Sequence, residues 1–153
     1  MLARTREGHE LLTFLSGVSA IPPKDTHIPL TWTLVIARYK GQMIWCYNPA
    51  RSQWETPGGG IEPGESLDEC ATRELHEESG QIALTLTFKG IFKIRLAPDH
   101  RLEYGGLFTA EIGELRPFVA NDETSDLRLV THLEELPGQV SDISRAMLVY
   151  ADA

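Results

Sequence analysis

Residues 58–80, GGGIEPGESLDECATRELHEESG, constrain this chain more than any other stretch of its sequence. The segment joins three glycines to a predicted helix. Ser66 stands three residues before Glu69, which is the spacing of a capping box. Gly80 stands where a glycine commonly ends a helix. The pattern therefore predicts a helix that begins after Ser66 and continues to Ser79.

This helix is predicted to carry acids on its apolar side. Glu74 and Glu78 fall inside the apolar stripe, and Glu77 lies at its edge. Three like charges on one face repel, and burying an uncompensated carboxylate is costly. A positive partner is therefore needed, and Mg²⁺ prefers such oxygen ligands. At 3.6 residues per turn, the apolar stripe consists of Leu67, Cys70, Ala71 and Leu75.

The alternative interpretation is an ordinary solvated acidic face. Two features of the sequence weigh against it. The carboxylates share the apolar side of the helix and follow a glycine-rich loop. Arg73 is also the only Lys or Arg between Gln53 and Gln81. The segment therefore favours a metal and phosphate site, which the structural context has to confirm.

The segment resembles the signature box of the Nudix hydrolases. That pattern runs Gly, five residues, Glu, seven residues, Arg-Glu, an aliphatic residue, any residue, Glu-Glu, any residue, Gly and an aliphatic residue. The box covers 23 of the 153 residues, and only its last position departs, with Gln81 in place of an aliphatic residue and Ile82 one place later. That departure concerns packing after the helix and no ligand. The matching positions are Gly59, Glu65, Arg73, Glu74, Leu75, Glu77, Glu78 and Gly80.

The resemblance implies an α/β fold, an α/β/α sandwich with a mixed β-sheet. It also implies that Mg²⁺ or Mn²⁺ is required as a cofactor. Glu77 and Glu78 would be metal ligands, with the Gly59 carbonyl as a third. Glu74 would be either a ligand or the base that deprotonates water, and Arg73 would orient it.

Family members often place the base or a further metal ligand outside the box. Glu103 and Glu123 are the candidates here, and the sequence does not choose between them. Glu65 would tie the loop to the helix. Lys93 and Arg95 share strand parity, so both could reach one phosphate of the substrate, or they could lie on a solvated strand face.

Composition limits the remaining possibilities. A length of 153 residues with 42 % hydrophobic content suits a single domain over residues 1–153. A net charge of −8 argues against binding to nucleic acid polymers. No apolar run approaches 18 residues, so no membrane segment is expected. Charged residues interrupt the apolar N-terminal run, and Cys46 and Cys70 lack metal spacing, so we expect a cytoplasmic protein with reduced cysteines.

The alternation of apolar residues predicts the order of the other elements. Residues 1–25 are ambiguous between helix and strand. Strands are expected at 31–39, 43–47, 82–96 with a break at Gly90, 102–111 and 127–131, followed by a short helical turn and a final helix capped by Ser141 or Asp142.

The resemblance implies hydrolysis of a pyrophosphate bond in a nucleoside diphosphate linked to another group. The leading hypothesis is a nucleoside triphosphate, modified or not, which gives the monophosphate and pyrophosphate. ADP-ribose or another sugar nucleotide is the alternative substrate. A non-catalytic domain that senses a nucleotide is the alternative class, although such domains commonly lose carboxylates that this chain retains. Oligomeric state stays open, a homodimer included.

Overall fold

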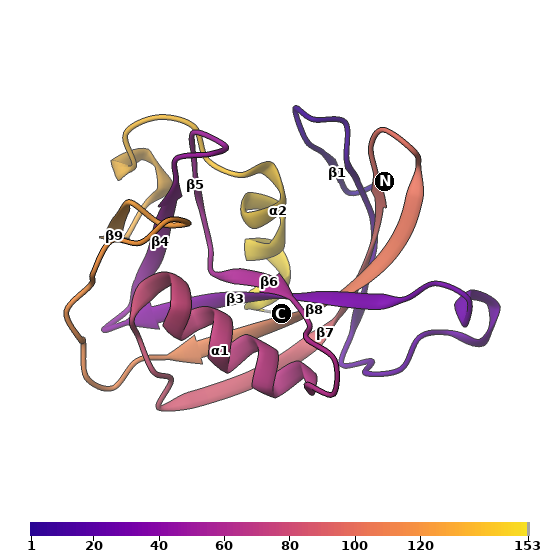
Figure 1. Cartoon of the computed structure of the whole chain (residues 1–153), viewed down its shortest axis with the longest axis horizontal. Helices are drawn as coiled ribbons and strands as arrows, with labels where there is room; N and C mark the ends of the chain where they lie inside the picture. Colours follow the sequence, from indigo (N-terminus) through magenta and orange to yellow (C-terminus); the bar gives the residue numbers. More distant parts are fainter. Residues whose placement is uncertain (153) are drawn as a thin grey trace.

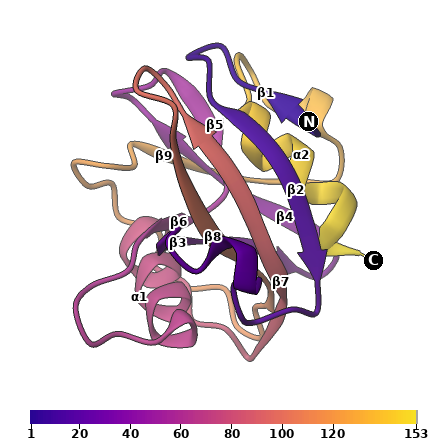
Figure 2. The same cartoon turned by 90° about the vertical axis from the view of Figure 1, so that its right-hand side faces the viewer.

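The computed structural model describes residues 1–152, in which a mixed nine-stranded sheet lies between two α-helices (Figures 1 and 2). The helices are α1 (Leu67–Ser79) and α2 (Asp142–Ala151), with short 3₁₀ turns at Pro23–Asp25 and Leu133–Glu135. The strands are β1 (Ala3–Arg4), β2 (Glu10–Ser16), β3 (Leu30–Tyr39), β4 (Gln42–Asn48), β5 (Gln53–Glu55), β6 (Gly58–Gly60), β7 (Thr85–Leu96), β8 (Arg101–Glu111) and β9 (Asp126–Val130).

The sheet has the strand order β1-β2-β7-β8-β3-β4-β5, with β6 paired to β3 and β9 paired to β4. The β3–β8 pair is parallel and the other pairs are antiparallel. Strand β6 consists only of glycines, and it pairs with the start of β3, where Thr33 lies opposite Gly59. The glycine loop of the sequence is therefore a short strand at the edge of β3.

Strand β3 is buried on both faces, which explains its nearly continuous apolar sequence. Val35 and Ala37 face α1 and pack in one core with Ala71 and Leu75. Leu34 and Ile36 point the other way and pack in a second core with Met147 of α2. One helix thus covers each face, which is the α/β/α sandwich that the sequence predicts.

The expected elements at 31–39, 43–47, 102–111 and 127–131 are strands, and the final helix is capped by Ser141, whose side chain accepts the Ser144 N–H. The predicted irregularity at Gly90 is a register shift in the β7–β8 pair. Gly90 has φ +146°, and a side chain there would overlap the carbonyl oxygen of Leu15. The ambiguous N-terminal region forms β1 and β2.

No helix within residues 1–152 combines the length and the apolar character needed to cross a bilayer.

Candidate active site

Helix α1 is held at both ends as its sequence predicts. Ser66 and Glu69 form the reciprocal capping box, at 3.1 and 2.9 Å, and Gly80 ends the helix in the left-handed conformation with φ 75°. Because the helix is fixed on the sheet by Ala71 and Leu75, residues one turn apart on the same side must face inward. Glu74 is accordingly 7 % exposed and Glu78 is half-buried.

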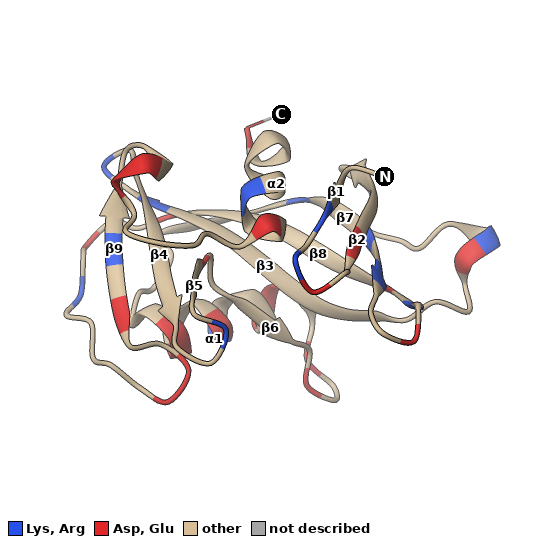
Figure 3. Ribbon diagram, turned by 90° about the horizontal axis from the view of Figure 1, so that it is seen from above, with Lys and Arg blue, Asp and Glu red and all other residues tan. Residues whose placement is uncertain are grey.

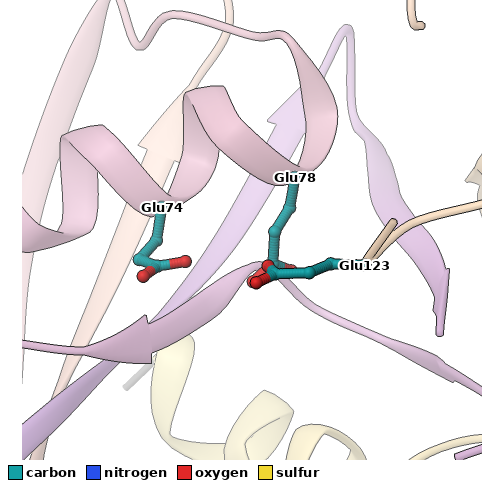
Figure 4. A group of neighbouring side chains, drawn as sticks. All are labelled: Glu74, Glu78 and Glu123. Atoms are coloured by element: carbon teal, nitrogen blue, oxygen red, sulfur yellow. The ribbon is translucent and has the colours of Figure 1, made fainter. Parts of the chain in front are cut away.

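Glu123 joins these two glutamates from the loop that precedes β9. One carboxylate oxygen each from Glu74, Glu78 and Glu123 lies within 4.8 Å of the others. In Figure 4, Glu74 and Glu78 leave the same side of α1, and Glu123 reaches towards Glu78 from a different segment. Asn121 positions this loop, because its amide donates to the Glu77 carbonyl at 3.0 Å and its Oδ1 accepts the N–H of Glu123 at 2.9 Å.

Arg73 organises the acids on the other side of the cluster. It donates two hydrogen bonds to Glu65, at 2.7 and 2.9 Å, and one to Glu74 Oε1 at 2.8 Å. It also reaches the Gly60 carbonyl at 2.8 Å and Glu77 at 3.1 Å. Arg73 therefore fastens the glycine strand and the loop before the helix to α1, and it fixes the orientation of the Glu74 carboxylate.

The surroundings shift the pKa values of these acids in opposite directions. Hydrogen bonds from Arg73 lower the pKa of Glu65 to about 2. Burial, assisted by the charge of Glu74, raises the pKa of Glu78 to about 9. Burial also raises the pKa of Glu74, although Arg73 acts against this. Glu74 and Glu78 thus share a region of low solvation in which two negative charges are unfavourable.

This arrangement suits a hard divalent cation. Three carboxylates from two segments converge, and within residues 1–152 only Glu74 among them has an ion pair, with Arg73. Mg²⁺ prefers such oxygen ligands. Gly59 lies directly against the group, since a Cβ atom at this position would overlap the Glu74 carboxyl. The absence of a side chain at Gly59 is therefore required for the backbone to approach the acids.

A cavity of about 500 Å³ adjoins the glycine strand. All three glycines of β6 line it, together with Trp32 of β3 and the beginning of α2. Thr56, which precedes the glycines, is buried and hydrogen-bonds the Ser144 hydroxyl of α2 at 2.9 Å. The glycine strand thus borders both the acid cluster and a cavity large enough for a small ligand.

The remaining predicted site residues lie at different distances from the cluster. The Glu77 side chain is half-exposed and contacts Arg73. Glu103 lines the cavity and is not one of the three clustered acids. Lys93 pairs with Asp25 at 2.8 Å and Arg95 pairs with Glu10 at 3.2 Å. Their parity agrees with the prediction, but neither lines the cavity, because the alternate residues Ile94 and Leu96 face it.

Two features of the site were not inferred from the sequence. Asn121 orients Glu123, and the run Asn-Asp-Glu-Thr is a signal for the side-chain turn that it forms. The N-terminal turn with Thr5 and His9 forms part of the cavity wall, and no sequence pattern brings it there.

Gln81, the departure from the box, is buried and bonds the backbone of Arg116 through both amide atoms, at 2.8 Å each.

Known proteins resemble this chain over both its sequence and its fold. The RNA pyrophosphohydrolase of Photorhabdus laumondii is 43 % identical over 47 residues, which are 31 % of this chain and 27 % of that protein. The RNA pyrophosphohydrolase of Haemophilus influenzae has the same identity over 47 residues, 31 % of this chain and 24 % of its own length. The match thus spans about a quarter of each of these relatives.

Among solved structures, the Bacillus subtilis pyrophosphohydrolase BsRppH superposes with a TM-score of 0.73 at 23 % identity, covering 95 % of this chain and 89 % of that one. The NUDIX domain of Shewanella oneidensis NrtR, complexed with ADP ribose, gives 0.65 at 14 % identity, covering 86 % and 92 %. At sequence identities of 23 and 14 %, these two matches show a shared fold and nothing further. The model of the NUDIX domain family matches residues 27–149, so the chain belongs to the NUDIX family.

Proposed function

We propose that this chain is a metal-dependent pyrophosphohydrolase acting on a nucleoside diphosphate linked to another group. The substrate that we propose first is a nucleoside triphosphate, modified or not, which is converted to the monophosphate and pyrophosphate. The observation that carries the proposal is the convergence of Glu74, Glu78 and Glu123 within 4.8 Å, beside a glycine strand that borders a cavity. A bound cation would relieve the repulsion between these carboxylates, two of which are partly or fully removed from solvent.

Glu78 and Glu123 would hold Mg²⁺ or Mn²⁺, with the backbone carbonyl of Gly59 as a further ligand. When bound, such a cation neutralises phosphate oxygens and acidifies a coordinated water. Glu77 stays a predicted ligand that would have to leave Arg73 in order to reach the ion. The glycine strand would bring substrate phosphates close to the acids, since it has no side chains to exclude them.

Glu74 would serve either as a ligand or as the base. Its Oε1 is held by Arg73, and residues 1–152 supply no hydrogen bond to its Oε2. A buried carboxylate with a raised pKa is suited to accept a proton from water near neutral pH. Arg73 would keep this carboxylate aimed at the reacting water, so its role would be to position Glu74. Pyrophosphate hydrolysis then depends mainly on alignment and charge neutralisation.

The test is a substrate panel with product identification. Purified chain is incubated with nucleoside triphosphates, oxidised nucleotides, sugar nucleotides and dinucleoside polyphosphates, each with Mg²⁺, Mn²⁺ or EDTA. We expect release of a nucleoside monophosphate and pyrophosphate that EDTA abolishes. A folded protein that binds Mg²⁺ but is inactive on the whole panel would favour the non-catalytic sensor. ADP-ribose hydrolysis alone would select the sugar-nucleotide alternative, in keeping with the ligand in the Shewanella structure.

A second candidate substrate is the triphosphate at the 5′ end of an RNA. The relatives that match around the box are RNA pyrophosphohydrolases, and the Bacillus pyrophosphohydrolase matches nearly the whole fold. The net charge of −8 opposes extended contacts with an RNA backbone, so any recognition would be confined to the first nucleotides. Comparing kcat/KM for a 5′-triphosphorylated oligonucleotide and for the matching free nucleotide decides between the two substrates.

A further inference from the structure

One wall of the cavity comes from residues outside the family match. The matched region begins at residue 27, whereas Thr5 and His9 lie in the turn that connects β1 to β2. The turn is closed by hydrogen bonds from the Thr5 N–H to the His9 carbonyl at 2.8 Å and from the His9 N–H to Thr5 Oγ1 at 3.1 Å. It is therefore an ordered part of the wall, and it lies outside the residues that the family model matches.

The same turn is fastened across the cavity. The Arg6 guanidinium donates to Gln53 Oε1 of β5 at 3.1 Å, and the Arg6 backbone N–H donates to Asp142 of α2 at 3.2 Å. Gln53 and Asp142 line the cavity as well. The wall formed by the turn is thus fixed to β5, which leads to the glycine strand, and to the first residue of α2.

His9 offers the cavity a hydrogen-bond donor of defined position. Its Nδ1 accepts the backbone N–H of Ala97 at 3.0 Å, which places the ring proton on Nε2. Nε2 has no hydrogen-bond partner within residues 1–152, and the side chain is only partly buried. The ring therefore leaves its Nε2–H as a donor for whatever enters the cavity.

Glu103 offers the cavity an acceptor in an equally fixed orientation. Its Oε2 accepts the Thr31 hydroxyl at 3.0 Å, and its Oε1 accepts Arg101 Nε at 3.2 Å. Each carboxylate oxygen can accept a second hydrogen bond. In the sheet, Leu11 pairs with Ile94 and Ile94 pairs with Glu103, so these three side chains share one face. His9 precedes Leu11 by two residues and lies on that face too.

The donor and the acceptor stand on backbone positions far enough apart for a flat ligand to lie between their side chains. From β2 across β7 to β8 there are two strand spacings, and Glu103 lies two residues further along the strand direction than His9. Together these give roughly 12 Å between the Cα atoms of His9 and Glu103. Trp32 lies on the same face and adds a flat aromatic wall to the cavity. Its ring packs edge-on against Phe92, with 4.8 Å between the ring centroids. A Cβ atom at the neighbouring Gly60 would meet only one atom, at 3.9 Å, so space remains open beside the indole.

We propose that His9 and Glu103 read opposite edges of the nucleobase in this cavity, and that Glu103 selects bases with an exocyclic amino group. The proposal rests on the proposed function. The fixed carboxylate accepts an N–H from the amino group of cytosine or adenine, and it repels the carbonyl oxygen that replaces this group in uracil or hypoxanthine. The Nε2–H of His9 donates to an acceptor on the far edge, such as the cytosine 2-carbonyl or the adenine N3.

The test compares substrates that differ only at this group. The kcat/KM ratios CTP/UTP and ATP/ITP are measured with Mg²⁺ for the wild type and for Glu103→Gln. We expect at least one wild-type ratio of about tenfold or more, because a site built for a hydrogen bond rejects a ligand that leaves it unpaired. Glu103→Gln substitutes a donor of the same shape and should lower that ratio at least about tenfold. Equal loss of kcat for all four nucleotides would instead make Glu103 part of the hydrolytic machinery and overturn the proposal.

Two variants separate the roles of the two His9 nitrogens. His9→Asn keeps an acceptor near the position of Nδ1 and removes the Nε2 donor, whereas His9→Gln keeps a donor near Nε2 and removes the acceptor for Ala97. We expect KM to rise several-fold more in His9→Asn than in His9→Gln, with kcat unchanged. This is the result of losing a contact that binds the substrate and the transition state equally well. The reverse order would show that His9 only supports the β7–β8 hairpin and would overturn its role. Melting temperatures verify that each variant is folded.

A binding measurement separates this proposal from the proposed function. Calorimetric titration of CMP, UMP, AMP and IMP into the chain with EDTA needs no catalysis. Preference for CMP over UMP or for AMP over IMP, lost in Glu103→Gln, supports base selection even if no nucleotide is hydrolysed. Hydrolysis of all four triphosphates at equal kcat/KM, with equal binding of the monophosphates, would leave the hydrolase standing and overturn base selection.

Discussion

The acids around α1 fall into two groups. In the paired group, Glu65, Glu74 and Glu77 contact Arg73, whereas in the unpaired group, Glu78 and Glu123, neither acid has an ion pair within residues 1–152. Glu65 accepts two hydrogen bonds from Arg73, which lower its pKa to about 2. Glu78 has no ion pair within residues 1–152, and burial raises its pKa to about 9. In Figure 3, acids (red) appear on α1 and on neighbouring segments of the chain. Acids that are neutralised by Arg73 join the loop, the glycine strand and the helix. Acids that no basic side chain neutralises are suited to bind a metal ion from solution.

The largest expected effect follows from removing an acid of the unpaired group. Glu78→Gln takes away a proposed ligand, so we expect hydrolysis to fall by more than the roughly 10- to 100-fold that a lost outer-shell partner costs. The measurement is kcat/KM for the best substrate of the panel at saturating Mg²⁺. Asp68→Asn is the matched control, because it removes one exposed negative charge from the first turn of the same helix. Equal activity of both variants would contradict the distinction between the two groups.

The paired group is tested by Arg73→Lys. Lysine keeps the charge but cannot form the fork that joins Glu65, Glu74 and the Gly60 carbonyl. We expect kcat to fall about 10- to 100-fold because Glu74 loses its orientation. Unfolding by urea should show a loss of about 2 kcal/mol, within the roughly 0.5–3 kcal/mol by which most substitutions destabilise a protein. A variant that loses stability while kcat stays at the wild-type value would remove Arg73 from the positioning of Glu74.

Asn121→Ala weakens the unpaired group without touching a proposed ligand. Asn121 holds Glu123 in place through the backbone of its loop, so we expect affinity for Mg²⁺ to fall about tenfold. Calorimetric titration of the metal measures this directly. Asn121→Ser keeps a side-chain acceptor for the Glu123 N–H without adding charge and loses the donor to Glu77, so it should bind Mg²⁺ more tightly than the alanine variant. The opposite order would show that Glu123 does not depend on this turn.

The part of the site that was predictable from the sequence is the part encoded by local spacing. The capping box, the inward face with Glu74 and Glu78, and the ending at Gly80 follow from helix periodicity. Glu123 could be proposed only as one of two candidates, because the fold decides which loop reaches the helix.

The cavity wall at His9 depends on strand order, which no local pattern reveals. Lys93 and Arg95 are the opposite case, because they were predicted as phosphate contacts and do not line the cavity. Strand parity is local, but the sheet face that borders the cavity is a property of the whole fold.

The smallest expected effect concerns stability without metal. The pKa of Glu78 rises from 4.5 to about 9 on folding, so the folded chain binds more protons than the unfolded chain between these pH values. Stability should therefore decrease as pH rises through this window, with the penalty complete above pH 9. In EDTA at pH 8, Glu78→Gln should be more stable than the wild type, because the variant has no carboxyl group whose ionisation favours the unfolded chain; each kcal/mol gained raises the Tm by about 2–4 °C.

Urea unfolding in EDTA at pH 6 and at pH 8.5 measures the slope. The wild type should lose stability between the two values, and Glu78→Gln should lose less. Mg²⁺ should reverse the ranking, since the cation stabilises only a chain that retains its ligands. Parallel pH profiles for the wild type and Glu78→Gln would mean that Glu78 is solvated in the folded chain. The contrast between the paired and unpaired acids of α1 would then lose its physical basis.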